Sequence, residues 1–359
     1  MKAENTTLND DYDILLTPGG DSRWDLIGED LVEYTSSVDT LRISAQLGNA
    51  CTYRCTYCVP GDYDGRYRWP ENEQYDKLIE LVDIIDSTYK SPPYNKKHII
   101  WELLGGEITT WRNIEKFVTY ITSRGHLIQL ITNGIRTARW WEQYGGMFEH
   151  VTLSYHPESA DYKHITEVGN ILTSKDVNVG GLIMMYPETW NTCLEAVEYM
   201  SKNAQFRVEL KKLELRTSGV AKLHWIYTDD QKKYIRDTRV QTQWAPKKKQ
   251  VENKSLYSTY KVKKLQDRYQ FEVTNIQDII NENKNNWQGW KCNIGIDTLY
   301  INSDGMLKSA GCFHNDEADL FNWITEDVEN FKFPTQAIVC PFTTCTCVHD
   351  VRARKERGN

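Results

Sequence analysis

The chain has 359 residues, of which 40% are hydrophobic and 26% charged, and its formal net charge at pH 7 is −7. This balance is typical of a globular protein with one large or two medium domains, and it argues against a disordered chain or one that coats nucleic acid. No apolar run approaches the roughly 18 residues that a membrane-spanning helix needs.

The cysteines carry the first functional signal. Residues 1–13 are polar and acidic, unlike a signal or transit peptide, so a cytoplasmic location is expected for the nine cysteines. In a reducing cytosol, cysteines are metal ligands or catalytic groups more often than disulfides. Three lie near the start of the chain and five near its end. Cys193 stands alone in a predicted helix, where we expect a small core residue.

A first strand is predicted over residues 40–47, where apolar and polar residues alternate, and the cysteine trio follows it on a loop. Cys51, Cys55 and Cys58 provide only three potential ligands, whereas a structural zinc site requires four. Three thiolates on one loop can bind three irons of a [4Fe–4S] cluster and leave the fourth iron without a protein ligand. A structural zinc loop or three buried thiols are the alternatives.

Strands and helices then alternate up to residue 216, which predicts an α/β fold: a partial (β/α)6 TIM-like barrel with a small C-terminal, cysteine-rich α+β extension. Further strands are predicted over residues 97–104, 127–132, 150–155, 177–186 and 206–216. Helices are predicted over residues 74–89, 111–123, 138–144, 158–175 and 188–203. In such folds the active residues emerge at the C-terminal ends of the strands.

Polar groups occur at several of these strand ends. The second strand ends in Gly105-Gly106-Glu107, and the third in Asn133-Gly134. Both pairs can also be ordinary turn residues, so each has a structural and a functional interpretation.

The fourth strand ends in Ser154-Tyr155-His156-Pro157, the fifth in Tyr186-Pro187-Glu188, and the sixth at Arg216. His156 is either an acid/base or substrate contact or a structural residue. Arg216 either binds a carboxylate or forms a salt bridge on the rim.

The cysteine loop, Cys51-Thr-Tyr-Arg-Cys55-Thr-Tyr57-Cys58, resembles the CxxxCxΦC hallmark (Φ aromatic) of the radical S-adenosylmethionine (radical SAM) enzymes. The resemblance implies an open-site [4Fe–4S] cluster that binds and reductively cleaves SAM to a 5′-deoxyadenosyl radical, which abstracts hydrogen from a substrate. The family usually has Pro after its Gly-Gly-Glu motif, where this chain has Ile108. The resemblance further implies a set of SAM-binding residues: Tyr57, Gly105, Gly106, Glu107, Asn133, Ser154 and Arg216.

A basic segment follows the predicted barrel. Residues 232–268 contain 12 Lys or Arg and three acids, a local net charge of +9. Such a segment could dock an acidic peptide, a nucleotide or RNA, although most charged runs are solvated faces.

Five cysteines occupy the last part of the chain. Cys292 precedes a predicted hairpin (298–302 and 306–308), and Cys312 follows it. The pattern is similar to the SPASM/twitch extensions of radical SAM enzymes, which implies an auxiliary [4Fe–4S] cluster. One cluster takes four thiolates, so one cysteine is spare, and zinc is the alternative. The remaining candidates are Cys340, Cys345 and Cys347.

These predictions divide the chain into an N-terminal extension (1–39), a radical SAM barrel (40–216), a basic linker or insert (217–287) and an auxiliary cluster domain (288–359). We expect a peptide or protein substrate and an electron donor such as flavodoxin or ferredoxin, with no membrane partner. A small-molecule, nucleotide or sugar substrate is the second hypothesis. A zinc-stabilised nucleic-acid-binding protein is the third.

Overall fold

The computed structural model describes two compact units. The described residues are 31–35, 39–58, 64–216, 222–224, 227–244, 260–264, 270–273, 286–312, 318–327, 331–345 and 348–357. The larger unit consists of those within Asp39–Ala245 and Ile294–Gln336. The smaller unit consists of those within Met1–Val38, Pro246–Asn293 and Ala337–Asn359. This grouping differs from the four consecutive segments expected from the sequence, because segments far apart in the chain share the smaller unit.

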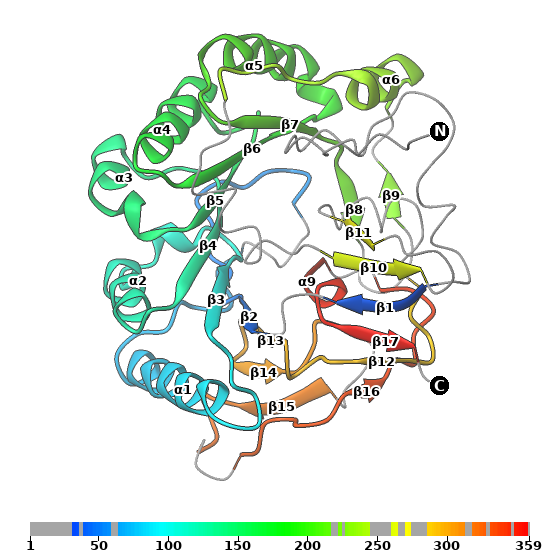
Figure 1. Ribbon diagram of the computed structural model, residues 1–359. Helices are drawn as coiled ribbons and strands as arrows, with labels where there is room; N and C mark the ends of the chain where they lie inside the picture. Colours follow the sequence, from blue (N-terminus) through cyan, green and yellow to red (C-terminus); the bar gives the residue numbers. More distant parts are fainter. Residues whose placement is uncertain are drawn as a thin grey trace, which may run out of the picture. The chain divides into compact units, whose positions relative to one another are not determined.

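The larger unit is built on a mostly parallel sheet with the strand order β15-β14-β13-β2-β3-β4-β5-β6-β7 among the described residues. Strands β2 to β7 pair in parallel with their sequence neighbours, and helices α1 to α5 connect them along one face of the sheet (Figure 1). The predicted α/β partial barrel is confirmed. The strands are β2 (Thr40–Ala45), β3 (His98–Leu103), β4 (Leu127–Thr132), β5 (His150–Tyr155), β6 (Asn178–Met184) and β7 (Arg207–Lys211). The helices are α1 (Glu73–Lys90), α2 (Ile114–Ser123), α3 (Ala138–Tyr144), α4 (Tyr162–Ser174) and α5 (Trp190–Asn203).

The predicted boundaries differ from the structure at two places that matter. Helix α4 begins at Tyr162, four residues later than predicted, because the Asp161 side chain accepts a hydrogen bond from the Lys163 backbone and caps the helix there. The predicted sixth strand is split into β7 and β8 (Glu214–Arg216). Between them, the Leu213 N–H donates to the Tyr227 hydroxyl at 2.9 Å instead of to a neighbouring strand. Strand β8 pairs with β9 (Lys222–His224) and is followed by helix α6 (Asp229–Asp237).

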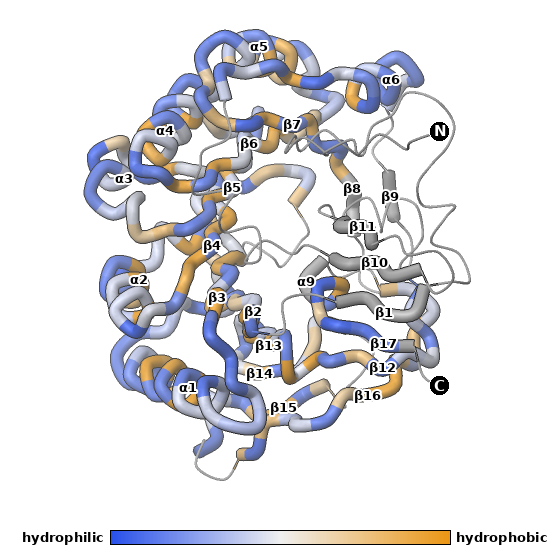
Figure 2. Tube along the Cα trace, viewed as in Figure 1, coloured by the Kyte–Doolittle hydropathy of each residue, from blue (hydrophilic) through white to orange (hydrophobic). Residues whose placement is uncertain are grey.

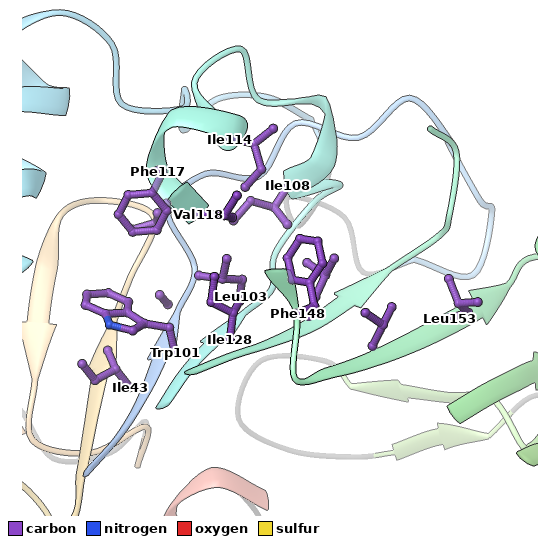
Figure 3. Packing of buried hydrophobic residues seen from close by; sticks show 14 of the residues in the cluster. Ile43, Trp101, Leu103, Ile108, Ile114, Phe117, Val118, Ile128, Phe148 and Leu153 are labelled. Atoms are coloured by element: carbon purple, nitrogen blue, oxygen red, sulfur yellow. The ribbon is translucent and has the colours of Figure 1, made fainter. Parts of the chain in front are cut away.

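Residue spacing explains how the helices cover the sheet. Helix α2 buries Ile114, Phe117, Val118 and Ile121, which lie on one face at the three- and four-residue spacing of an α-helix. These side chains pack on alternate residues of β3 and β4, which point to the same face of the sheet (Figure 3). Figure 2 shows the resulting mixture of hydrophobic and hydrophilic residues along α1 to α5. The labelled partners from the strands in Figure 3 include Trp101, Leu103 and Ile128.

The predicted C-terminal hairpin extends the barrel sheet. Strand β13 (Thr298–Ile301) pairs in parallel with β2, and β14 (Met306–Lys308) and β15 (Asp319–Asn322) continue antiparallel from it. The Lys96 ammonium lies 2.6 Å from the Asp297 carboxylate, and both side chains are almost fully buried. This ion pair fixes the start of β13 to the barrel. Three short 3-10 helices complete the unit: η2 (Ile108–Thr110), η3 (Gly145–Met147) and η4 (Pro187–Thr189).

The smaller unit contains an antiparallel sheet with the order β11-β10-β1-β17-β12-β16 among the described residues. Its strands come from both ends of the chain and from the basic segment. They are β1 (Leu31–Thr35), β10 (Tyr260–Lys264), β11 (Gln270–Val273), β12 (Trp290–Cys292), β16 (Ile338–Val339) and β17 (Lys355–Arg357), with the short helix α9 (Val348–Val351) before β17. Within the described residues, no helix combines the length and the apolar character required to span a bilayer.

Candidate functional site

The cysteine loop leaves the C-terminal end of β2, as predicted. Cys51, Cys55 and Cys58 form no disulfide; Cys55 is buried and the other two are partly exposed. The Cys58 N–H donates to the Cys55 carbonyl at 3.1 Å, which makes a tight turn around Tyr57. At the start of the loop, the Asn49 side chain is bound to Asp64 (2.9 Å) and to the backbone of residue 67 (3.0 Å). These contacts hold the start of the cysteine loop in place.

Burial makes the Cys51 and Cys55 thiols weaker acids than an ordinary cysteine. It raises the pKa of Cys51 to about 11, with the nearby charges of Glu107 and Cys55 adding to the effect. Burial likewise raises the pKa of Cys55. Because a metal ligand must be a thiolate, metal binding at this loop would release protons.

The two glycines after β3 allow the cysteine loop to approach closely. A Cβ at Gly106 would lie 2.4 Å from the Ala50 carbonyl oxygen, and the residue has a φ of +49°. A Cβ at Gly105, whose φ is +91°, would lie 2.3 Å from the Gln46 side chain. The space at both Cα atoms is thus filled by the loop itself. The next N–H, that of Glu107, donates to the same Ala50 carbonyl at 2.8 Å.

The Glu107 carboxylate is buried and its hydrogen bonds are all to this chain. One oxygen accepts from the Thr109 and Thr132 hydroxyls (2.6 and 2.7 Å), and the other accepts from the Asn133 N–H (2.6 Å). Burial raises its pKa in spite of these bonds. The carboxylate therefore ties the end of β3 to the end of β4, a role that the Gly-Gly-Glu spacing alone did not indicate.

Asn133 both forms a turn and contacts the cysteine loop, so the structural and the functional interpretation of its sequence both apply. Its side-chain oxygen accepts from the Ile135 N–H at 3.0 Å, which closes a turn in which Gly134 has a φ of +70°. Its amide nitrogen donates to the Cys51 sulfur at 3.8 Å. The structure thus brings the end of β4 to the first cysteine of the loop.

Two residues that the sequence did not assign to the site hold the middle of the loop. The Glu158 carboxylate accepts from both the N–H and the hydroxyl of Thr56, each at 2.8 Å. The Tyr186 hydroxyl lies 3.0 Å from the same Thr56 hydroxyl. Glu158 follows β5 and Tyr186 follows β6. Their positions just after strand ends were the available signal, but an acid or a tyrosine there is too common to be assigned without coordinates.

Tyr57 and His156 lie together beside the loop. The Tyr57 hydroxyl is 3.0 Å from His156 Nδ1, and the two rings stack with centroids 5.9 Å apart. The same hydroxyl is hydrogen-bonded to the Cys55 side chain, and burial raises the pKa of Tyr57. Burial also lowers the pKa of His156 to about 4, so the imidazole is neutral at pH 7.

The last two SAM-binding candidates of the barrel are less informative. Ser154 is buried at the end of β5, two residues before His156. Arg216 ends β8 and pairs through its backbone with Lys222, but its side chain is outside the described residues.

The C-terminal cysteines are divided between the units. Cys292, Cys340 and Cys345 belong to the smaller unit, Cys312 belongs to the larger one, and Cys347 lies outside the described residues. Burial raises the pKa of Cys345 to about 12; the charges of Cys292 and Cys340 act in the same direction and that of Lys355 acts against it. These three thiols are therefore neighbours. Cys193 is fully buried in α5, as predicted.

The donor set of the N-terminal loop fits an iron–sulfur cluster. Within the described residues, no three Cys, His, Asp or Glu side chains converge on a point where one metal ion would bind. A cubane does not require such a point, because each thiolate binds a different iron. Cys51, Cys55 and Cys58 lie on one short loop without forming a disulfide, and Cys51 and Cys55 are close enough for their charges to interact. This matches a cluster held at three corners.

Comparisons with known proteins agree with this site. Residues 46–204 match the sequence model of the Radical SAM superfamily, a segment that contains the cysteine loop and strands β3 to β6. No curated protein matches the chain.

Among solved structures, the chain is similar to Streptococcus suis SuiB, at 11% identity over 80% of this chain and 64% of SuiB with a TM-score of 0.43. It is also similar to SuiB bound to precursor peptide SuiA, with 11% identity, 81% and 64% coverage and a TM-score of 0.44. For archaeal TYW1 the identity is 14%, the coverage 49% and 66%, and the TM-score 0.30. The chain thus spans less than two thirds of the length of each of these proteins. The match therefore assigns the segment of residues 46–204, which is less than half of the chain, to the radical SAM superfamily.

Proposed function

We propose that this protein is a radical SAM enzyme whose cluster is bound by Cys51, Cys55 and Cys58. When bound, such a cluster passes one electron to SAM and yields methionine and the 5′-deoxyadenosyl radical, which abstracts hydrogen from a substrate. One observation carries the proposal. Three cysteines that form no disulfide lie on the loop after β2, which is held against the ends of β3 and β4, with the Asn133 amide donating to the Cys51 sulfur.

Residues of this chain hold the cysteine loop in position. The Gly105-Gly106 pair lets the loop pack against the end of β3, and Glu158 holds Thr56 at the middle of the loop. For SAM we propose contacts from the residues at the strand ends, namely Tyr57, Gly105, Gly106, Glu107, Asn133, Ser154 and Arg216. Keeping a reactive radical away from water would be a further task of the residues around it.

Formation of 5′-deoxyadenosine tests the proposed activity. The full chain is reconstituted with iron and sulfide without oxygen and then mixed with SAM and dithionite. We expect wild type and Cys193→Ala to release 5′-deoxyadenosine and Cys55→Ala to release none, because Cys193 is a core thiol and Cys55 a cluster ligand. Equal turnover by Cys55→Ala and wild type would reject this site.

We further propose an auxiliary [4Fe–4S] cluster bound by four of Cys292, Cys312, Cys340, Cys345 and Cys347. The proximity of Cys292, Cys340 and Cys345 supports it. Replacing Cys345 with Ala should remove about half of the iron, since one of two four-iron clusters would be lost. Stoichiometric zinc in the purified protein, with unchanged iron, would instead favour a zinc site.

For the substrate, we propose an acidic peptide or protein that docks on the basic segment 232–268. In the described part of this segment, Lys232 and Arg236 on α6 are exposed, although each has an acidic neighbour on the same helix. The reductant we propose is a flavodoxin or a ferredoxin, and a reducing cytoplasm suits the free thiols.

Binding of a fluorescent Glu-rich peptide to the reconstituted protein tests the docking proposal. Replacing Lys247, Lys248 and Lys249 with Glu should weaken binding at least tenfold, because the attraction between opposite charges becomes repulsion. Unchanged binding, or tighter binding of a nucleotide or sugar than of the peptide, would favour the small-molecule hypothesis. Tight binding of RNA by a zinc-loaded, iron-free protein would favour the third hypothesis, a zinc-stabilised nucleic-acid-binding protein.

A further inference from the structure

The Tyr57 hydroxyl lies between the sulfur of Cys55, a proposed cluster ligand, and the half-buried imidazole of His156. It is hydrogen-bonded to the Cys55 side chain and lies 3.0 Å from His156 Nδ1. The tyrosine ring is held in place by His156, which stacks on it, and by Tyr186, whose ring centroid is 4.9 Å away. Tyr57 itself is only 8% exposed. The ring that carries the hydroxyl is therefore held in position by its neighbours and is largely shielded from solvent.

The number of available protons determines which group donates in each of these hydrogen bonds. A phenol has one proton to donate, and a thiolate bound to iron has none, so the sulfur can only accept. The bond between Tyr57 and Cys55 must then run from the hydroxyl to the sulfur. His156 Nδ1 must carry the proton that it shares with the Tyr57 oxygen. A neutral imidazole has one N–H and can satisfy this arrangement.

A second sulfur of the loop also has a donor with a fixed orientation. The Asn133 amide nitrogen donates to Cys51 at 3.8 Å. Because the amide oxygen of the same side chain accepts from the Ile135 N–H, a flipped amide would lose that bond and present an oxygen to the sulfur. The backbone of Asn133 is held in turn by Glu107.

We propose that Tyr57 and Asn133 donate hydrogen bonds to the cluster-binding sulfurs of Cys55 and Cys51 and thereby make the cluster easier to reduce, with His156 as the positioning residue for the Tyr57 hydroxyl. This inference rests on the proposed function and deepens it. Reduction adds negative charge to the cluster and its sulfur ligands, so a donor bond becomes stronger in the reduced state. Hydrogen bonds to the sulfurs are one of the factors that set the potential of an iron–sulfur cluster.

The test is a redox titration, followed by electron paramagnetic resonance, of the reconstituted full chain without SAM. Tyr57→Phe keeps the ring and removes only the hydroxyl. Asn133→Ala removes the amide. The matched control is Tyr53→Phe, because Tyr53 lies on the same loop and its ring meets His156 edge to face with centroids 6.3 Å apart. Iron content is measured for each variant before the titration.

We expect Tyr57→Phe and Asn133→Ala each to lower the equilibrium constant for reduction about tenfold, which is a shift of about 59 mV to more negative potential for a one-electron couple. Tyr53→Phe should leave the potential unchanged. His156→Ala should shift it in the same direction as Tyr57→Phe, and the double variant should shift it no further, since both changes affect one hydrogen bond. His156→Ala also keeps the inference testable if Tyr57→Phe assembles no cluster.

Three results would contradict the inference. The first is a Tyr57→Phe potential equal to that of Tyr53→Phe, with full iron content. The second is a shift to more positive potential in either donor variant. The third is an additive effect of His156→Ala and Tyr57→Phe. A wild-type cluster that cleaves SAM while the variant potentials stay unshifted rejects this inference alone, whereas a wild-type protein that binds no cluster rejects the proposed function as well.

Discussion

The Glu107 carboxylate accepts a hydrogen bond from the backbone N–H of Asn133 at 2.6 Å, and this bond joins the ends of β3 and β4. Asn133 in turn places its amide on the Cys51 sulfur. The Glu107 carboxylate is therefore linked through Asn133 to Cys51, which we propose as a cluster ligand. In this structure its carboxylate holds the strand ends that face the cysteine loop.

Replacing Glu107 with Ala should destabilise the fold as well as the site. The change leaves the buried donors of Thr109, Thr132 and Asn133 without their acceptor, and we expect the free energy of unfolding to fall by about 2–4 kcal/mol. Urea unfolding measures this loss. Glu198→Ala is the control, because Glu198 is exposed on α5 and should change stability by no more than about 0.5 kcal/mol. Equal stability of the two variants would show that Glu107 is not a structural clamp.

Gly106→Ala should displace the cysteine loop. The added Cβ would lie 2.4 Å from the Ala50 carbonyl oxygen in a residue with positive φ. Gly125→Ala is a matched control, since Gly125 also has positive φ but nothing within 4 Å of its Cβ position. We expect both variants to lose about 1 kcal/mol of stability from backbone strain, and only Gly106→Ala to lose iron on reconstitution. Full iron binding by Gly106→Ala would argue against close packing of the loop on the glycine pair.

Stability should fall below about pH 6.5 because of His126. Its Nδ1 accepts from the Trp101 indole N–H at 3.0 Å and its Nε2 lies 2.6 Å from Asp86, an arrangement that requires the neutral ring. Burial lowers the pKa of His126, so the unfolded chain takes up a proton before the folded one does. The stabilisation is complete above the unfolded pKa of about 6.5 and is lost as the pH falls through and below it, at up to about 1.4 kcal/mol per pH unit.

Urea titrations at pH 7.5 and 5.5 measure this dependence. His126→Gln should reduce this dependence without removing it, because burial also lowers the pKa of His156, whereas replacement of the exposed His98 with Gln should leave it as in wild type. An identical pH dependence in the His126 variant would rule out the buried neutral imidazole as its source.

Removing only one member of the buried Lys96–Asp297 ion pair should destabilise the fold. Lys96→Met leaves a carboxylate buried without its partner and should lower the free energy of unfolding by about 3–5 kcal/mol. The double change Lys96→Met with Asp297→Leu should recover much of this loss, because no charge remains buried. Denaturant unfolding of the two variants and wild type provides the comparison. Equal stability of the single and double variants would contradict this account.

Local pattern was sufficient to predict most of the barrel. Residues 127–132, 138–144 and 150–155 form the elements predicted for them, since alternation and helical spacing are properties of the local chain. The pairing of β13 with β2 was not predictable in this way, because paired residues such as Thr298 and Arg42 are 256 positions apart and leave no local pattern. The buried Lys96–Asp297 pair likewise depends on the folded structure.

The residues of the candidate site were likewise predictable only where their spacing in the sequence identified them. Cys51, Cys55, Cys58 and the glycine pair could be found from spacing, because ligands on one loop stay close in sequence. The contacts of Glu158 and Tyr186 with Thr56 join three different loops, so each residue alone looked like an ordinary loop residue. The orientation of the Tyr57 hydroxyl between Cys55 and His156 also required coordinates.

The most direct test of the central claim is Mössbauer spectroscopy of the ⁵⁷Fe-reconstituted chain, recorded with and without SAM and compared between wild type and Cys55→Ala. We expect a four-iron cluster in wild type in which the signal of one iron changes when SAM is added, because that iron has no protein ligand. The SAM-sensitive signal should be missing from Cys55→Ala. A wild-type spectrum without a four-iron cluster, or one in which no iron responds to SAM, would contradict the account.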